Sequence, residues 1–425
     1  MAILLKNDVP NISPAYNEMY VTVEQDSAAI YNQDNYKFVA EVYIATSGTP
    51  IRFDFFPNVD APNTGFIDIH RVLESYVKSF LAENLIITAA FGPTDGSLNY
   101  YRVEYGWSYI NSLGVFVEVL NDLTGPTSYV WEGVFDRFDF IEEINEGSPY
   151  DDWLMNTTNG TDANFLTYNK NNKVLIGDYG THQILTDTPS DIDYMEVVTY
   201  DSSGVLIDTF QLASLANPAV FNSRNQTLRS APASLNEYIG AFLLGAQPII
   251  TSSVATYTIQ IFEAAGVPVS EIINFELQEE CRYTPIRLHF LNKLGAFDSF
   301  NFLKANKKTT AIKNKTYKKT GRNQTALATV YHHNDATNVT YFVESKDTIK
   351  ANSDWVTEAE HAWLLELLTS PEIYMESRSK KNTIIYLPIQ EIKQKSYQEK
   401  TDDIDHLYNL SIDIVMSADN YRQRK

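Results

Sequence analysis

The first question is which residues could carry out chemistry. The sequence contains none of the short signatures of P-loop proteins, dinucleotide-binding folds, zinc hydrolases or serine hydrolases. Its seven histidines are scattered, and only His332 and His333 are adjacent. Neighbouring residues of a strand point to opposite faces, so this pair is poorly placed to chelate one metal ion. We therefore predict that the protein is not an enzyme and has no catalytic residue, metal site or cofactor.

Clustered acidic residues are the next candidates, because carboxylates bind hard cations or act in pairs on glycosidic bonds. The clusters are Asp136 with Asp139, Asp151 with Asp152, and Asp187 with Asp191 and Asp193. The last cluster could supply oxygens to calcium, but it lacks the residue order and the glycine of an EF-hand, so a solvated loop is favoured. The two carboxylates of a glycosidase come from distant strands, and with 54 acidic residues that activity is neither supported nor excluded.

Basic residues are concentrated in one segment of an otherwise acidic chain. The 425 residues carry a formal net charge of −21, which divides into −26 for residues 1–280 and +5 for residues 281–425. Between positions 304 and 322 there are eight basic residues and no acidic one. They form the candidate interaction patch: Lys304, Lys307, Lys308, Lys313, Lys315, Lys318, Lys319 and Arg322.

Three interpretations of this patch remain open. The simplest is the solvated face of a hairpin, with Ile312 and Tyr317 as its few inward side chains. The second is a docking surface for the acidic N-terminal part of a neighbouring subunit. The third, nucleic-acid binding, ranks last because Tyr317 is the only aromatic residue in the segment and the rest of the chain repels phosphate.

The composition limits the class of protein. Cys281 is the only cysteine, so no intrachain disulfide and no multi-cysteine zinc site can form. The start, Met1 to Lys6, has no long apolar core, and the apolar stretch from Ile239 to Ile250 is interrupted and shorter than the roughly 20 residues that cross a bilayer. We expect no signal peptide and no membrane insertion.

The pattern of apolar residues predicts a mainly β protein, a multi-module β-sandwich architecture with a few short helices. Aromatic residues make up 13% of the chain, and short alternating segments are separated by Gly, Pro, Asn and Asp. The order strand, turn, strand, short helix, strand, strand occurs twice, which indicates two related modules. We predict β-rich modules over residues 1–145 and 146–280, the second a distant repeat of the first, and a C-terminal β-rich domain over 281–425.

Three local predictions can be checked directly. Gly125 and Pro126 indicate a turn between two strands. The segment Phe66–Val77 has apolar residues at helical spacing, which predicts a short helix there. Thr357 and Glu360 have the spacing of a capping box, so we predict a helix near residues 358–369 that ends before Pro371.

Several strings resemble virion structural proteins of tailed bacteriophages and prophages, a poorly characterised family. They are the segments 281–302, 353–374 and 420–424, together with 53–58 and 65–76. The resemblance covers most of the chain and implies a virion component that is made in the host cytoplasm, contacts other virion proteins and has no catalytic residue to carry over. Placement in the tail or baseplate rests on analogy of architecture.

The leading hypothesis is thus a structural component that forms a homo-oligomer of the tail or baseplate through β-module and charge-complementary contacts. The alternative is a receptor-binding protein that reads host-surface glycans through exposed Tyr and Trp side chains, with Trp107, Trp131 and Trp153 as candidates, although buried tryptophans are commoner. A glycan-degrading enzyme and a head decoration protein are less favoured.

Overall fold

The computed structural model shows a chain that is mostly β, in two compact units. Unit 1 comprises residues 1–278 and 291–298, and unit 2 comprises residues 279–290 and 299–425. The structure describes residues 3–45, 49–81, 91–93, 96–145, 149–155, 163–186, 192–213, 224–242, 248–263, 265–279, 282–320, 323–324, 328–330, 333, 336–381, 383–393 and 408–417.

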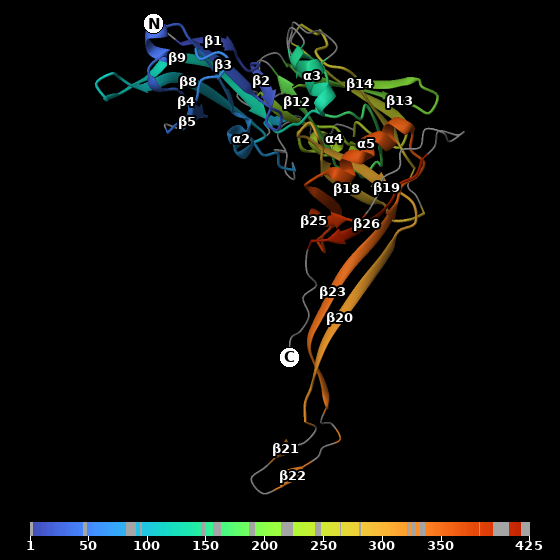
Figure 1. The fold of residues 1–425 in the computed structure, drawn as a ribbon. Coiled ribbons are helices and arrows are strands. Elements are labelled where there is room, and N and C mark those ends of the chain that lie inside the picture. Colours follow the sequence, from blue (N-terminus) through green and yellow to red (C-terminus); the bar gives the residue numbers. More distant parts are fainter. Residues whose placement is uncertain are drawn as a thin grey trace. The chain divides into compact units, whose positions relative to one another are not determined.

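Unit 1 contains two β-sandwiches (Figure 1). The first is made of a three-stranded sheet, β1 (Ile3–Asn7), β3 (Tyr20–Gln25) and β6 (Thr64–Asp68), and a five-stranded sheet in the order β2 (Ile12–Pro14), β9 (Phe116–Trp131), β8 (Leu98–Ile110), β4 (Asp34–Ile44), β5 (Ile51–Phe55). The second is made of two sheets. One has four strands in the order β10 (Leu154–Met155), β12 (Thr181–Thr186), β15 (Asn225–Arg229), β7 (Phe91–Pro93). The other has five strands in the order β11 (Asn171–Val174), β17 (Ile273–Leu277), β16 (Thr256–Phe262), β13 (Tyr194–Tyr200), β14 (Leu206–Ala213).

The two five-stranded sheets have the same strand order and sense. In each, the first strand, β2 or β11, pairs in parallel with the last strand, β9 or β17, and the other neighbours are antiparallel. In each sandwich a helix follows a strand of the other sheet, namely α2 (His70–Leu73) after β6 and α4 (Pro232–Phe242) after β15. A distant repeat would produce this arrangement, and the repeat itself stays a prediction. The predicted boundary at residue 145 stays a prediction.

Alternating side chains explain these strands. In β13, Met195, Val197 and Thr199 are buried, and the residues between them face outward. Each sandwich has its own apolar core. The remaining helices of unit 1 are α1 (Ala28–Tyr31), α3 (Arg137–Asn145) and the short 3₁₀ turns η1 (Glu74–Tyr76) and η2 (Asp151–Trp153).

Unit 2 is a seven-stranded sheet with one described helix. Its strand order is β19 (Phe297–Phe302), β18 (Ile286–Leu291), β24 (Ile373–Arg378), β25 (Ile384–Ile392), β26 (Ser411–Met416), β23 (Asn338–Asn352), β20 (Lys307–Lys318). The helix α5 (Glu358–Thr369) packs Trp363, Leu364 and Leu367 into the core. A small strand pair, β21 (Asn323–Gln324) and β22 (Thr329–Val330), belongs to the same unit.

The mainly β fold class and the capped helix are confirmed. Thr357 Oγ1 accepts a hydrogen bond from the backbone N–H of Glu360 at 3.3 Å, and the Glu360 carboxylate accepts one from the backbone N–H of Thr357 at 2.8 Å. The backbone N–H groups at the N-cap and at the third helical position are thereby satisfied, as the capping-box spacing requires.

Two local predictions were wrong. Gly125 and Pro126 lie inside β9, where the register against β8 shifts between Arg102 and Glu104. A β-bulge tolerates proline because no ladder hydrogen bond is needed at that point. The predicted helix over 66–77 is also shorter, because Phe66 to Asp68 complete β6 and only His70–Tyr76 are helical, the last three residues in a 3₁₀ turn.

The segment Leu291–Asp298 of unit 1 contains an unusually close backbone contact. Gly295 has a φ of +82°, and a Cβ atom there would lie 1.3 Å from the backbone oxygen of Glu132. Leu294 and Ala296 on either side are buried in a third core with Trp131, Phe135 and Trp153. Only glycine fits this position.

We predict that Gly295→Ala lowers the free energy of unfolding by more than about 4 kcal/mol, because it combines left-handed backbone strain with a collision against backbone atoms. Gly114 is the matched control, since its φ is +74° and no atom of the described residues lies within 4 Å of the place that an added methyl group would take. Gly114→Ala should cost only about 1 kcal/mol. Urea unfolding measures both values, and equal losses would contradict the packing argument.

A second prediction concerns Asp68, which precedes α2. Its Oδ1 accepts hydrogen bonds from the backbone N–H groups of Met19 at 3.0 Å and His70 at 3.2 Å, and its Oδ2 lies 2.7 Å from His70 Nδ1. Burial raises the pKa of this carboxyl, but these hydrogen bonds outweigh burial, so its pKa lies below the ordinary 3.8.

A depressed folded-state pKa stabilises the fold above the unfolded pKa, and that stability is lost as the pH falls through the folded value. Asp68→Ala should therefore lower the free energy of unfolding by about 1–2 kcal/mol at pH 7, with the difference from wild type narrowing below about pH 4. Denaturant unfolding at several pH values tests this. Asp60→Ala, in an exposed loop, is the control and should show a smaller loss.

Candidate interaction surface

The candidate basic residues lie on or beside a two-stranded ribbon of unit 2, which we call the arm: Thr310–Lys318 of β20 paired with Asn338–Asp347 of β23. Strand β26 pairs with β23 only from Thr348 to Asn352. Beyond Thr348, among the residues that the structure describes, the two strands of the arm are paired only with each other. Figure 1 shows them running side by side past the end of β26, over a length of about 30 Å at the usual rise per residue.

The arm is exposed on both of its faces. Every residue of β20 is exposed, and most residues of β23 from Asn338 to Glu344 are exposed as well. Ile312 is 65% and Tyr317 is 48% exposed. The expectation that these two side chains point inward was therefore wrong, because a two-stranded ribbon with no second layer has no inside.

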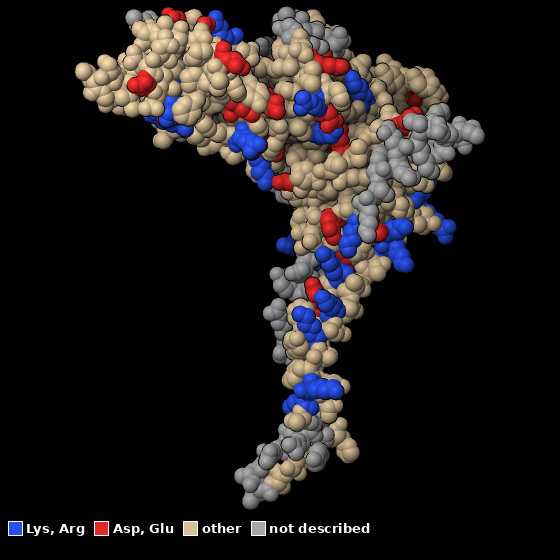
Figure 2. Space-filling view, in the orientation of Figure 1, with Lys and Arg blue, Asp and Glu red and all other residues tan. Residues whose placement is uncertain are grey.

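The structure describes seven of the eight candidate residues, and these form two groups. Near the root of the hairpin, Lys304 Nζ is 2.6 Å from Asp354 Oδ2, and Lys308 Nζ is 2.8 Å from Asp347 Oδ2. The others that the structure describes lie along the strand or just past its end and are all exposed: Lys307, Lys313, Lys315, Lys318 and Lys319. Arg322 lies outside the described residues. Figure 2 shows blue side chains spaced along this part of unit 2.

Asp347 gives the root of the arm its local order. Its Oδ1 accepts a hydrogen bond from Thr310 Oγ1 at 2.6 Å while its Oδ2 holds Lys308. Farther out, Lys313 is in register with Glu344. Within the arm, β20 contributes three lysines and no acidic residue, against one lysine and two acidic residues in β23. The arm is therefore basic mainly because of one strand.

Two aromatic residues of the arm were not predicted from the sequence. Tyr341 lies with its ring centroid 6.0 Å from that of Tyr317, and Lys315 Nζ lies 5.1 Å from the centre of the Phe342 ring. Both come from the opposite strand, and a register shift between Lys315 and Thr316 brings them to this position. In the sequence these residues stand in the apolar run Tyr341–Phe342–Val343, but the strand that pairs with this run cannot be identified without the register.

The other candidates are not brought together. Trp107, Trp131 and Trp153 are buried, with 8%, 1% and 7% of their surfaces exposed, so none of them offers a ring to a glycan. Asp136 Oδ2 lies 2.5 Å from Lys293 Nζ in an ion pair. Asp187 and Asp191 lie outside the described residues, as do Cys281 and His332.

The described part of the chain contains no group of three His, Cys, Asp or Glu side chains that could hold a metal ion. Nor does any helix within the described ranges combine the length and apolar character needed to cross a membrane.

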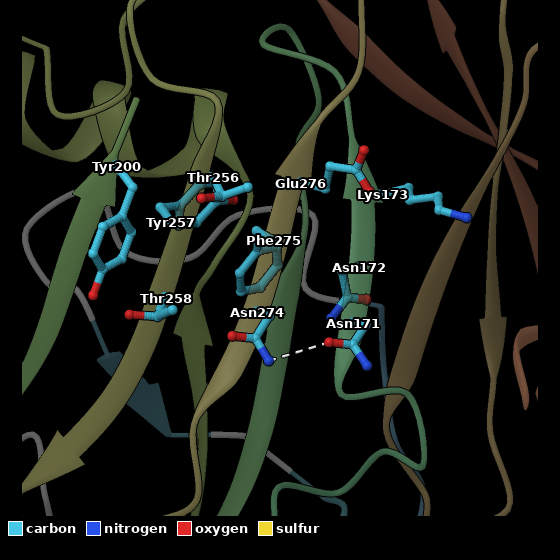
Figure 3. A pocket seen from close by; sticks show the side chains of 10 residues that line it. All are labelled: Asn171, Asn172, Lys173, Tyr200, Thr256, Tyr257, Thr258, Asn274, Phe275 and Glu276. Carbon is cyan, nitrogen blue, oxygen red and sulfur yellow. Dashed lines mark hydrogen bonds between the residues drawn. The ribbon is translucent and has the colours of Figure 1, made fainter. Parts of the chain in front are cut away.

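One cavity of about 430 Å³ opens on the five-stranded sheet of the second sandwich (Figure 3). Its outward-facing side chains come from neighbouring strands, and Asn274 Nδ2 donates to Asn171 Oδ1 at 3.1 Å. Tyr200, Thr256 and Thr258 supply hydroxyl groups, and Lys173 is in register with Glu276. These groups can form hydrogen bonds but include no nucleophile with a neighbouring base, which fits a solvated sheet face.

Comparisons with known proteins give little further information. No family model and no curated protein matches the chain. Among solved structures, the crystal structure of the FN1–FN3 domains of chicken CNTN1 shares 13% identity, with 64% of this chain and 67% of that chain covered at a TM-score of 0.17.

The native conformation of E. coli alpha-2-macroglobulin shares 10% identity, with 97% of this chain and 20% of that chain covered, also at a TM-score of 0.17. This chain thus spans a fifth of that protein. Neither likeness reaches a TM-score that supports an argument, so the β-sandwich description rests on the sheets themselves.

Proposed function

We propose that this chain is a structural, non-enzymatic protein that forms a homo-oligomer through its arm. The single observation that carries the proposal is a ribbon of paired strands that is exposed on both faces and carries Ile312, Tyr317 and Tyr341 into solvent. An isolated two-stranded ribbon is marginally stable in water, because it buries little apolar surface against the entropy of ordering its backbone. A partner that covers one face supplies the missing layer.

Charge favours a second copy of this chain as that partner. The arm presents lysines from β20, whereas residues 1–280 carry a net charge of −26. Opposite charge on the two surfaces speeds encounter and disfavours contact between two arms. The exposed Tyr317, Tyr341 and Phe342 supply the apolar contact that ion pairs at a surface do not provide.

The resemblance of residues 281–302 and 353–374 to bacteriophage virion proteins extends the proposal. On that basis the oligomer belongs to the tail or baseplate of a phage particle and contacts other virion proteins there. The absence of a catalytic signature in the sequence is consistent with such a role. The three tryptophans named as candidates for a glycan-binding role are buried.

Reversing the charge of the arm tests the proposal. We predict that the double variant Lys313→Glu with Lys315→Glu weakens self-association by at least about tenfold at low ionic strength, because two favourable surface charges become repulsive. Sedimentation of the full chain over a range of concentrations measures this, and the wild-type association should weaken as salt is added. Circular dichroism should be unchanged.

The control variant is Lys380→Glu with Lys381→Glu, two exposed lysines of unit 2 that lie outside the arm. It should associate like the wild type. Hydrogen exchange adds an independent reading, because the amides of 310–318 should be slowed on assembly. Unchanged association of the arm variant, or a wild type that stays monomeric, would show that the arm is merely solvated.

A further inference from the structure

A hairpin loop with the sequence Asn-x-Leu-Gly-x-Phe occurs twice in unit 1, in Asn111-Ser112-Leu113-Gly114-Val115-Phe116 and in Asn292-Lys293-Leu294-Gly295-Ala296-Phe297. In each, the N–H of the glycine donates to the carbonyl of the asparagine, at 2.9 and 3.2 Å, and the glycine has a positive φ. Each asparagine N–H also donates to the carbonyl four residues later, at 2.9 and 2.8 Å. This is a three-residue hairpin loop with a glycine bulge.

The second copy of this loop is buried and shows what the motif can do. Leu294 and Ala296 are 0% and 2% exposed, in the core that contains Ile12, Trp131 and Phe135. Hydrogen bonds fix it there. The N–H of Val134 donates to the carbonyl of Lys293 at 2.7 Å, and Asn292 Nδ2 donates to the carbonyl of Leu166 at 2.8 Å.

The first copy, the tip between β8 and β9, is exposed. Leu113 is 84%, Val115 54% and Phe116 61% exposed. From Tyr105 to Asn121 the only charged residue is Glu118, and it is paired with Arg52 at 2.6 Å. An uncharged group of three protruding apolar side chains is an unfavourable surface for water and a favourable one for a partner.

The backbone of this tip is ready for burial. Asn111 Oδ1 accepts hydrogen bonds from the N–H groups of both Leu113 and Val115 at 3.0 Å, in addition to the two backbone bonds of the turn. The N–H groups of Asn111, Leu113, Gly114 and Val115 are therefore satisfied internally, and removing these four from water costs little. The turn is also held in one conformation, so binding orders few groups.

A complementary cavity of about 400 Å³ lies at the other end of β9. It is formed around Ser13 and Pro14 of β2, which pair with Val130 and Trp131. Its apolar lining consists mainly of Val9, Pro10, Met19, Phe140, Ile144 and Tyr150. Asn7, Asp8, Asn17 and Glu18 also line it, so the cavity offers polar groups beside its apolar surface.

The tip cannot reach the cavity of its own molecule. Phe116 begins β9 and Val130 lies fourteen residues along the same strand, which at the usual rise is a separation of about 45 Å. A second molecule is therefore required. Because the two surfaces are different parts of the chain, the contact is of the head-to-tail kind.

We propose that the tip Asn111–Phe116 of one copy inserts into this cavity of a second copy, as the loop Asn292–Phe297 is inserted into a core of its own unit. The contact is independent of the arm, so either can fail without the other. Its occupant is a second copy of this chain, since the tip and the cavity are found in one sequence and the buried loop demonstrates the packing.

The test uses the full-length chain with one variant at the tip and one at a matched loop. Val115→Asp places a charge in the tip, and Val205→Asp places it at the equivalent position of the turn Asp201-Ser202-Ser203-Gly204-Val205, where the valine is 60% exposed and the N–H also donates to the first side chain. We expect Val115→Asp to weaken self-association by at least about tenfold, because it places a charge in the proposed contact. Val205→Asp should leave self-association unchanged, because its turn lies outside that contact.

Cross-linking identifies the two surfaces. In a Cys281→Ser background, Leu113→Cys combined with Ile144→Cys should form disulfide-linked oligomers on oxidation, and Leu113→Cys combined with Phe66→Cys should not. Carrying this out with Lys313→Glu and Lys315→Glu present separates the tip from the arm. Equal association of both valine variants, or no specific cross-link, would overturn the proposal. Binding of the wild type to phosphatidylcholine vesicles without dimerisation, lost in Val115→Asp, would also overturn it by making lipid the occupant.

Discussion

The close approach of Gly295 to the carbonyl of Glu132 is the contact on which the construction of unit 1 depends. It allows Leu294 and Ala296 to enter the third core, whose other members come from both sandwiches: Ile12 and Trp131 from the first, Trp153 and Leu185 from the second. Each sandwich already has its own core, and this cluster joins them, together with β7, which precedes β8 of the first sandwich and pairs with β15 of the second. Any side chain at position 295 would hold the loop away from that cluster and leave an apolar cavity.

Local rules predicted what local interactions decide. The alternation of Tyr194–Tyr200 indicated a strand, and the spacing of Thr357 and Glu360 indicated a capped helix, because each depends on residues a few positions apart. The failures have long-range causes. Gly125 and Pro126 look like a turn in isolation, but the bulge opposite β8 accommodates them within β9. The candidate surface shows the same difference. Its lysines are clustered in one segment and were predicted, whereas the positions of Tyr341 and Phe342 beside them depend on the register of a distant strand.

The net charge of −21 describes neither part of the chain well. Acidic residues dominate before residue 281, and the arm is basic because three lysines of β20 face two acids and one lysine of β23. Such a separation affects association more than folding, because exposed pairs contribute little to stability but add over a whole surface in steering an encounter. The exposed aromatic residues of the arm matter for the opposite reason, since their contribution appears only at contact.

The two surfaces proposed for self-association should contribute in different ways. The arm gains order when a partner covers it, so part of its contact energy is offset by the entropy of ordering, and its charges make that contact sensitive to salt. The tip Asn111–Phe116 is already ordered by the Asn111 side chain and carries no charge, so its contact loses little entropy and is insensitive to salt. An assembly that uses both surfaces keeps the apolar contact of the tip at high ionic strength, whereas the contact of the arm weakens as salt is added. In the proposed assembly, the tip would therefore keep the contact at high salt, and the arm would select among partners by charge.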